Sequence, residues 1–352
     1  MYEKSKSVVF EKPRQVNVKE IALPAVNENS VVIKTVRSGI SSGTEMKVYT
    51  GLSGALDGEL WYPLIPGYEQ AGEIVFLGKN VRHIKTCSGE SLAVGDRVMA
   101  NEVRKYPDYC AAWGGQVEYT VKDLTAVKDT MDMIAKIPDN VSYEEAVTSY
   151  LAGVAYKGIE KVNIQKNEKV LVIGMGNVGL SALQLAKMHT DTVIAMDIKD
   201  ARLDFAKKYT DKIINPARED AVEKLLSYTD NKKADVIIEC SGNPDVIPGL
   251  PDFLRDGGWG QSDEGGRIHL QGDYPRPASF IPYQRWFVKN ATVSMTCALR
   301  PGIKEKVLAL ISQKKFDARS LYNKVYNIND APQAYKYLEK NRYDTLKILL
   351  EW

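Results

Sequence analysis

An apolar strand followed by a glycine-rich turn and an apolar helix is the feature that most limits how this chain can fold. The segment reads Val170-Leu-Val-Ile-Gly-Met-Gly-Asn-Val-Gly-Leu-Ser-Ala-Leu-Gln-Leu-Ala. In such a unit, Gly174 permits the tight turn, Gly176 lets the backbone approach a pyrophosphate, and Gly179 lets the helix pack against the strand. Glycine-rich turns are common, so the residues around the motif decide how it is interpreted.

The start of the following helix strengthens the phosphate-binding interpretation. Asn177 and Val178 lie in its first turn, where unpaired N–H groups and the positive end of the helix dipole favour an anion. The cofactor site is therefore expected to include these two residues together with the three glycines.

An acidic residue then favours one dinucleotide over another. A second apolar strand, predicted over 192–196, ends in Asp197, which is suited to accept hydrogen bonds from the hydroxyls of an adenosine ribose and to repel a 2′-phosphate. NAD is therefore predicted rather than NADP. Two alternatives stay open: Arg202 could serve a phosphate, and Asp197 could act as an N-cap for the helix expected at 201–208.

Two further strand ends extend the predicted cofactor site. The apolar run 235–240 leads into Ser241 and Gly242, and the run 266–270 leads into Gln271 and Gly272. Ligands of open α/β sheets bind at the carboxyl ends of the strands. We expect these four residues near the nicotinamide ribose, although ordinary strand-to-loop turns would look the same.

The rest of the chain predicts a second, β-rich domain. Short β-rich runs occupy Ser7–Phe10, Val31–Val36, Gln70–Leu77, Arg97–Ala100 and Gln116–Val121, whereas strands alternate with helices from Lys169 onward. After Arg300-Pro301-Gly302, two helices and two strands are expected and could return to the first module. The predicted domains are residues 1–147, completed by 302–352, and residues 148–301.

Composition excludes several classes of function. Lysine and arginine number 47 and aspartate and glutamate 45, so the net charge is +2 and gives no general attraction to nucleic acid or an acidic membrane. No apolar stretch approaches the roughly 20 residues of a spanning helix, and a cytoplasmic protein is expected. The four cysteines are scattered without a C-x-x-C pair, which predicts free thiols.

Several motifs in one order resemble the medium-chain dehydrogenase/reductase superfamily. They are the run Gly39-Ile-Ser-Ser-Gly-Thr-Glu-Met, then Pro66-Gly-Tyr-Glu-Gln-Ala-Gly, Val94-Gly-Asp-Arg-Val, Gly114-Gly-Gln-Val-Glu-Tyr, the dinucleotide fingerprint, and Ile328-Asn-Asp-Ala-Pro-Gln-Ala-Tyr. The resemblance implies a GroES-like catalytic domain and a Rossmann domain, hence an α/β fold with a doubly wound parallel sheet. The first two motifs are most similar to the bacteriochlorophyllide hydroxyethyl dehydrogenase-like subgroup.

The same resemblance implies a homodimer or homotetramer, with sheet edges pairing near Ala291–Cys297. It also places hydroxyl side chains where zinc members of the family carry ligands. Ser42 or Ser41 stands for the first cysteine, Tyr68 for the histidine, and Thr148 or Ser149 for the later ligand. Neutral hydroxyls are poor zinc ligands, so no metal site is predicted.

Without zinc, another group must stabilise the reacting oxygen. The family alignment suggests Tyr68 as oxygen contact or acid/base if nearby charge lowers its pKa, Thr44 as proton relay, and Lys47 as an electrostatic group. Glu69 would orient this cluster. The alternative for Tyr68 is that its side chain only fills the space left by the missing metal.

Three other groups are weaker candidates. Lys347 aligns with a family arginine that approaches the pyrophosphate, with a solvated strand charge as the alternative. Trp113 could line the substrate cleft or lie in the core, and Gln284-Arg285-Trp286 could reach the nicotinamide or another subunit.

The predicted function is a zinc-independent, NAD-dependent oxidoreductase that interconverts a secondary alcohol and a ketone on a small polar, sugar- or cyclitol-like substrate. Two alternatives remain: an NAD(P)H-dependent reductase of activated double bonds, and a nucleotide-binding protein without catalysis.

Overall fold

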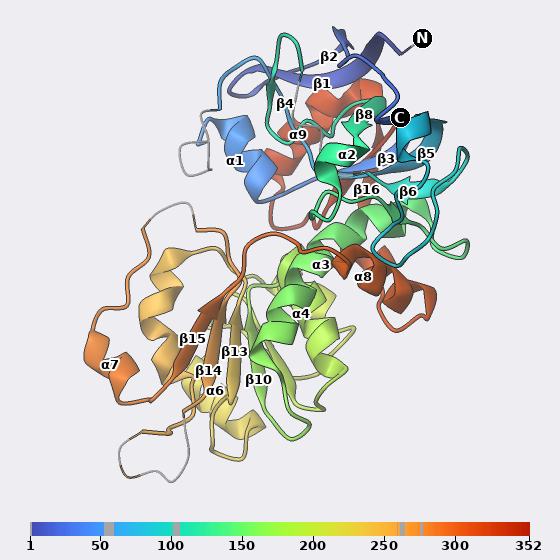
Figure 1. Cartoon of the computed structure of the whole chain (residues 1–352). Helices are drawn as coiled ribbons and strands as arrows, with labels where there is room; N and C mark the ends of the chain where they lie inside the picture. The colour runs from blue at the N-terminus through green and yellow to red at the C-terminus, as the bar shows by residue number, and fades with distance from the viewer. Residues whose placement is uncertain (1, 53–59, 101–105, 259, 261–264, 275–276) are drawn as a thin grey trace. The chain divides into compact units, whose positions relative to one another are not determined.

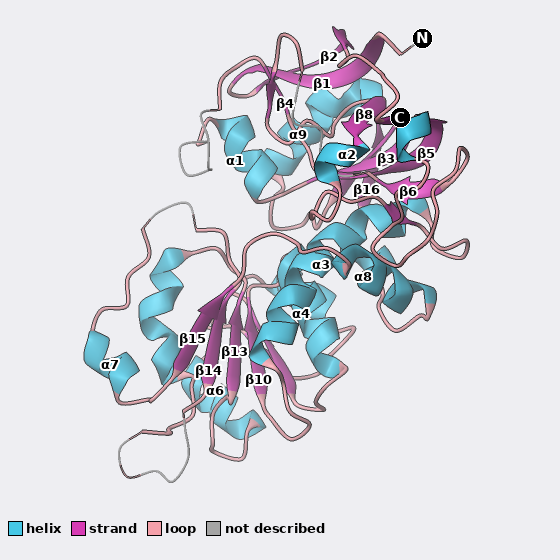
Figure 2. Ribbon diagram, viewed as in Figure 1, coloured by secondary structure: helices cyan, strands magenta, loops and turns pink. Residues whose placement is uncertain are grey.

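The computed structural model describes residues 2–52, 60–100, 106–258, 260, 265–274 and 277–352 (Figures 1 and 2). The chain forms two compact units. Unit 1 comprises Met1–Tyr150 and Leu299–Trp352, and unit 2 comprises Leu151–Ala298. Each boundary lies three residues from the one expected from the sequence (150 − 147 and 301 − 298), and helix α3, Tyr143–Val162, continues through the first of them.

Unit 2 is built on a six-stranded parallel sheet in the order β12-β11-β10-β13-β14-β15 (Figure 2). The order is that of a Rossmann fold, and its direction of winding reverses between β10 and β13. This confirms the predicted doubly wound parallel sheet. The strands are β10 (Val170–Ile173), β11 (Val193–Met196), β12 (Ile213–Ile214), β13 (Val236–Glu239), β14 (Arg267–Leu270) and β15 (Thr292–Met295).

The inner strands of this sheet are apolar because helices cover both faces. All residues of β10, β11 and β13 are buried, which is typical of a parallel sheet with no solvated side. Helix α4 packs on β10 and β11. Besides the C-terminal part of α3, the helical segments described in unit 2 are α4 (Asn177–Lys187), α5 (Asp200–Ala206), α6 (Ala221–Tyr228), η3 (Pro244–Asp252) and α7 (Tyr283–Phe287).

Unit 1 is β-rich and contains two sheets. The first has the order β2-β1-β4-β7, and the second has the order β16-β17-β3-β5-β6-β9 with β8 paired to β3. The strands are β1 (Lys4–Lys12), β2 (Gln15–Ala22), β3 (Ser30–Ile40), β4 (Leu64–Ile65), β5 (Glu69–Leu77), β6 (Arg97–Met99), β7 (Cys110–Ala111), β8 (Tyr119–Asp123), β9 (Ala135–Lys136), β16 (Lys324–Asn327) and β17 (Ile348–Glu351).

The C-terminal segment completes unit 1, because β17 pairs with β3 from the beginning of the chain. This pairing brings Lys347, which precedes β17, into the same unit as Tyr68 and Glu69. The helical segments of unit 1 are α1 (Thr44–Thr50), η2 (Lys79–Val81), α2 (Leu124–Val127), α8 (Ile303–Ser312), η4 (Arg319–Leu321), η5 (Ile328–Asp330) and α9 (Ala331–Lys340). In the part of the chain that the structure describes, no helix is long and apolar enough to cross a membrane.

Candidate active site

The glycine turn of unit 2 has the backbone geometry that a dinucleotide requires. Gly174 has a φ of +89°, and a Cβ built on it would lie 2.6 Å from the Cα of Ser241. A Cβ on Gly179 would overlap the carbonyl oxygen of Gly174, so only glycine lets helix α4 approach β10 this closely. By contrast, a Cβ on Gly176 would meet no heavy atom of the described residues within 4 Å.

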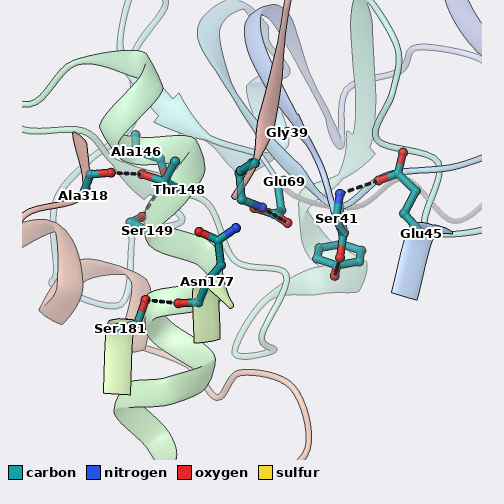
Figure 3. Close-up of polar contacts among 12 residues, drawn as sticks. Gly39, Ser41, Glu45, Glu69, Ala146, Thr148, Ser149, Asn177, Ser181 and Ala318 are labelled. Carbon is teal, nitrogen blue, oxygen red and sulfur yellow. Dashed lines mark hydrogen bonds and ion pairs between the residues drawn. The ribbon is translucent and has the colours of Figure 1, made fainter. Parts of the chain in front are cut away.

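The helix that follows is open to an anion. Gly176 is the N-cap of α4, and among the described residues no side chain caps the first turn. The backbone N–H groups at the start of this eleven-residue helix therefore remain suited to a phosphate. Asn177 is buried, and its carbonyl oxygen accepts a hydrogen bond of 2.7 Å from Ser181 Oγ (Figure 3). These residues fit the pyrophosphate of a dinucleotide.

Asp197 lies at the tip of β11 and contacts this turn. Its carboxylate accepts hydrogen bonds from the backbone N–H groups of Met175 (2.7 Å) and Lys199 (2.9 Å). The alternative that Asp197 is a helix N-cap is wrong, because α5 begins at Asp200 and its N-cap is Lys199. Arg202 is buried within α5, and the choice between NAD and NADP stays a prediction.

The other two predicted strand ends are neighbours. Strands β13 and β14 are paired up to Glu239 and Leu270, so Ser241–Gly242 and Gln271–Gly272 leave the sheet side by side. A Cβ on Gly272 would lie 2.9 Å from the backbone nitrogen of Gly242. The structure brings these residues and Gly174 together at one edge of the sheet, and their contact with a nicotinamide ribose stays a prediction.

A cluster of hydroxyl groups surrounds Tyr68 in unit 1. The Tyr68 hydroxyl donates a hydrogen bond of 2.6 Å to Ser41 Oγ, and the Thr44 hydroxyl also hydrogen-bonds to the phenol. Of the two serines proposed from the sequence, the structure thus places Ser41 beside Tyr68. The Tyr68 ring packs against Trp113 and Tyr150, with ring centroids 5.3 and 4.9 Å away.

A buried ion pair lies directly after Tyr68. Lys347 Nζ donates to both carboxylate oxygens of Glu69, at 2.7 and 2.5 Å, and both side chains are 0% exposed. The alternative of a solvated Lys347 is therefore wrong. Sequence analysis missed this pairing, in which Lys347 neutralises Glu69, and the contact of Lys347 with the pyrophosphate stays a prediction.

Burial and two nearby carboxyl groups raise the pKa of the Tyr68 phenol, and Ser41 and Thr44 only partly oppose the shift. The condition set for an acid/base role, a lowered pKa, is not met, because burial and the nearby carboxyl groups both raise the pKa. Tyr68 therefore keeps its proton and acts as a hydrogen-bond donor.

Glu45 is one of these two carboxyl groups, and Glu69 is the other. It is fully buried on α1 and accepts hydrogen bonds from the Tyr335 hydroxyl, Gln116 Nε2 (3.3 Å) and the backbone N–H of Ser41 (3.3 Å; Figure 3). Burial raises the pKa of Glu45 to about 7. A carboxyl group beside the Ser41–Tyr68 pair thus changes charge near neutral pH.

The residues that the family resemblance places at the zinc-ligand positions do not fit zinc. The Thr148 hydroxyl donates to the carbonyl oxygens of Glu145 and Ala318 (the latter 3.2 Å; Figure 3), and Ser149 donates to that of Ala146. Within the described residues no group of three or more His, Cys, Asp or Glu side chains could hold a metal ion. The set consists of neutral hydroxyls, which bind zinc poorly compared with thiolate or imidazole.

The remaining candidates have mixed outcomes. Lys47 is half-buried on α1, one turn after Thr44, and its role stays a prediction. Trp113 has a φ of +69° and partly lines the unit 1 core while contacting Tyr68. In the trio on α7, Arg285 is ion-paired with Asp252, and Trp286 is buried in the unit 2 core.

Comparison with known proteins identifies the family of the chain. Residues 27–139 match the alcohol dehydrogenase GroES-like domain, and residues 177–313 match the zinc-binding dehydrogenase family. The chain is 30% identical to an alcohol dehydrogenase of Geobacillus stearothermophilus over 66% of this chain and 69% of the relative. It is 29% identical to a sorbitol dehydrogenase of Bacillus subtilis over 72% and 73%.

A solved structure shares the fold. The crystal structure of 2R,3R-butanediol dehydrogenase from Bacillus subtilis has a TM-score of 0.79 at 20% sequence identity, and the similarity covers 99% of each chain. The GroES-like domain, the Rossmann sheet and these relatives define an oxidoreductase of the alcohol dehydrogenase type. The chain belongs to the medium-chain dehydrogenase/reductase superfamily.

Proposed function

We propose that this protein is a zinc-independent, NAD-dependent dehydrogenase that interconverts a secondary alcohol and a ketone on a small polyol or sugar-like substrate. The observation that supports the proposal most strongly is the hydrogen-bonded hydroxyl cluster Ser41–Tyr68–Thr44. The family resemblance implies zinc ligands at the positions of Ser41 and Tyr68, and neutral hydroxyls bind zinc poorly. Unit 2 contributes an open phosphate-binding turn at Gly176.

NAD is the hydride acceptor or donor of the proposed reaction. The N–H groups at the start of α4 hold its pyrophosphate, and Gly176 leaves room for it. Asp197 supports NAD over NADP, because a carboxylate that already accepts from Met175 N–H would repel a 2′-phosphate beside it.

The role of Tyr68 follows from its retained proton. The charge that develops on the substrate oxygen needs a hydrogen-bond donor, since no cation of the proposed site contacts that oxygen. Tyr68 supplies this donor by turning its hydroxyl hydrogen from Ser41 Oγ to the substrate oxygen. Thr44, which hydrogen-bonds to the phenol, can replace any proton that Tyr68 passes to the substrate. Lys347 neutralises Glu69 and so limits the negative charge next to the phenol.

The substrate class and the assembly are inferred from the relatives and from the sheet edge. Sorbitol and butanediol, in the names of the relatives, are both polyhydroxy compounds with secondary alcohols. A homodimer or homotetramer is proposed through β15, whose outer edge is unpaired in the described part of the sheet and whose Met295 side chain is exposed. A cytoplasmic location is part of the same proposal.

Gly176 offers a test that separates cofactor binding from folding. Gly176→Ala adds a methyl group into open space, so loss of the favoured N-cap glycine should cost no more than about 1 kcal/mol. The methyl group would stand where the pyrophosphate approaches, and we expect the Kd for NADH, measured by fluorescence titration, to rise at least about tenfold. Gly249→Ala is the matched control, because its added Cβ also meets no described heavy atom within 4 Å. Wild-type affinity in Gly176→Ala, or no NADH binding by the wild type, would overturn the proposal.

A further inference from the structure

A buried carboxylate at the end of β13 gathers several donors from neighbouring loops. Glu239 is 0% exposed. Its Oε1 accepts from the backbone N–H of Ser241 at 2.8 Å and from the Ser241 hydroxyl, and its Oε2 accepts from the Tyr274 hydroxyl. The backbone N–H of Gly242 also hydrogen-bonds to the carboxylate.

The backbone of the same residue ties down the next strand end. The carbonyl oxygen of Glu239 accepts from the N–H groups of Gln271 (2.8 Å) and Gly272 (3.0 Å). A Cβ on Gly272 would lie 2.9 Å from Glu239 Oε2, so this glycine is in direct contact with the carboxylate. Glu239 therefore joins the loop after β13 to the loop after β14.

The loop after β13 in turn supports the phosphate-binding turn. A Cβ on Gly174 would lie 2.6 Å from both the Cα and the nitrogen of Ser241, and the N–H of Cys240 donates to the carbonyl oxygen of Ile173 at 2.7 Å. Glu239 thus joins the ends of β13 and β14 directly, and the loop after β13 that it holds contacts the end of β10. All three ends lie at the carboxyl edge of the sheet, where open α/β folds bind ligands.

Stability alone does not explain a carboxylate at this position. Among the described residues, no lysine, arginine or histidine forms an ion pair with Glu239, and burial raises the pKa of its carboxyl group against the opposing hydrogen bonds. Burying a charged group without a counterion costs free energy that hydrogen bonds must offset. The retained carboxylate therefore points to a positioning role.

We propose that Glu239, together with Tyr274, is a positioning residue of the dinucleotide site. It holds the backbones of Ser241–Gly242 and Gln271–Gly272 in the conformation that binds the nicotinamide-ribose half of the cofactor. The inference rests on the proposed function. Neither residue needs to touch the cofactor, because the carboxylate acts through the two loops that it joins.

The test compares three variants. Glu239→Gln replaces one of the accepting oxygens with an amide nitrogen, which cannot accept a hydrogen bond from the surrounding donors. Tyr274→Phe removes the one hydroxyl that donates to Glu239 Oε2. Glu168→Gln is the matched control, because Glu168 accepts from Arg267 at 2.5 Å near the start of β10, at the opposite edge of the same sheet. Each variant is measured for its Kd for NADH, its midpoint of urea unfolding, and the hydrogen-exchange rates of the Gly242 and Gly272 amides without cofactor.

We expect Glu239→Gln to weaken NADH binding about tenfold, the effect of one lost charge-assisted hydrogen bond, and to speed exchange of both glycine amides. Tyr274→Phe should shift both readouts in the same direction to a smaller extent. Glu168→Gln should lower the unfolding midpoint and leave NADH binding and the exchange of these two amides unchanged.

One result would overturn the inference alone, and it can be told apart from failure of the proposed function. If Tyr274→Phe and Glu239→Gln keep the NADH affinity and the exchange rates of the Gly242 and Gly272 amides of the wild type, the cluster is only a structural contact. If Glu239→Gln does not fold, Tyr274→Phe decides by the same two readouts. A wild-type protein that binds no NADH would instead refute the proposed function, and this inference with it.

Discussion

Lys347→Met is expected to destabilise the protein strongly, because it leaves the Glu69 carboxylate buried without a counterion. Both side chains are fully buried, and Lys347 Nζ lies 2.7 and 2.5 Å from the two carboxylate oxygens. Breaking a buried ion pair by removing one partner costs about 3–5 kcal/mol, whereas replacing both partners is often close to neutral. We therefore expect Lys347→Met to lower the free energy of unfolding by about 3–5 kcal/mol at pH 8, and Glu69→Gln/Lys347→Met to recover most of it.

Urea unfolding monitored by tryptophan fluorescence measures this effect, since a change in midpoint at constant m-value reports stability. The dependence on pH provides a second check. Burial raises the pKa of Glu69, and Lys347 opposes that shift in the wild type. In Lys347→Met the folded pKa rises further above the unfolded value, so the folded state binds more protons and stability is lost as the pH increases.

The penalty of Lys347→Met should therefore be smaller at pH 5 than at pH 8, and the double variant should not show this difference. A loss below about 1 kcal/mol at pH 8, or a penalty independent of pH, would refute the reasoning, because a solvated pair is worth that little.

Three further substitutions test other parts of the structure. Tyr68→Phe should lower kcat/KM for ketone reduction by about 10²–10³ and leave the NADH affinity unchanged, because it removes one hydrogen-bond donor to the developing oxyanion. Full activity would show that Tyr68 only fills the cavity. In the folded protein the pKa of Glu45 is about 7, above its unfolded value, so this group stabilises the fold at low pH and loses the contribution as the pH rises through 7. Glu45→Gln should therefore remove a difference on the order of 3 kcal/mol between the free energies of unfolding at pH 5 and pH 8, measured by urea titration. If the free energy of unfolding keeps its wild-type dependence on pH, the burial of Glu45 is contradicted. Gly179→Ala should destabilise unit 2 by about 1–3 kcal/mol, because its Cβ overlaps Gly174; a wild-type melting temperature would disprove this close contact.

Much of unit 2 could be predicted because its signals are local. The strand, the glycine turn and the helix lie within one continuous segment, and Asp197 follows at the spacing set by one βαβ unit. In unit 1, strand β2 was missed although Val16 and Val18 alternate with polar residues. Strand β8 begins at Tyr119 rather than Gln116, because the backbone of Gln116 and Glu118 hydrogen-bonds to β1 and pairing with β3 starts only at Tyr119.

The site in unit 1 was harder to predict because its contacts join distant segments. Glu69 and Lys347 are 278 positions apart, and a lysine before a C-terminal strand does not reveal whether it is solvated or paired. The direction of the Tyr68 pKa depends on the buried carboxyl groups of Glu45 and Glu69, which helix α1 and strand β5 bring to one place. Glu239 escaped notice because a single acidic residue at the end of an apolar strand also suits an exposed loop.

The most direct test of metal-free hydride transfer is NADH oxidation with a polyol-derived ketone, by protein dialysed against a chelator and analysed for zinc. We expect the rate to be unchanged when the zinc content lies far below one atom per chain. Loss of activity on dialysis and its recovery on adding zinc would contradict the proposed role of Tyr68.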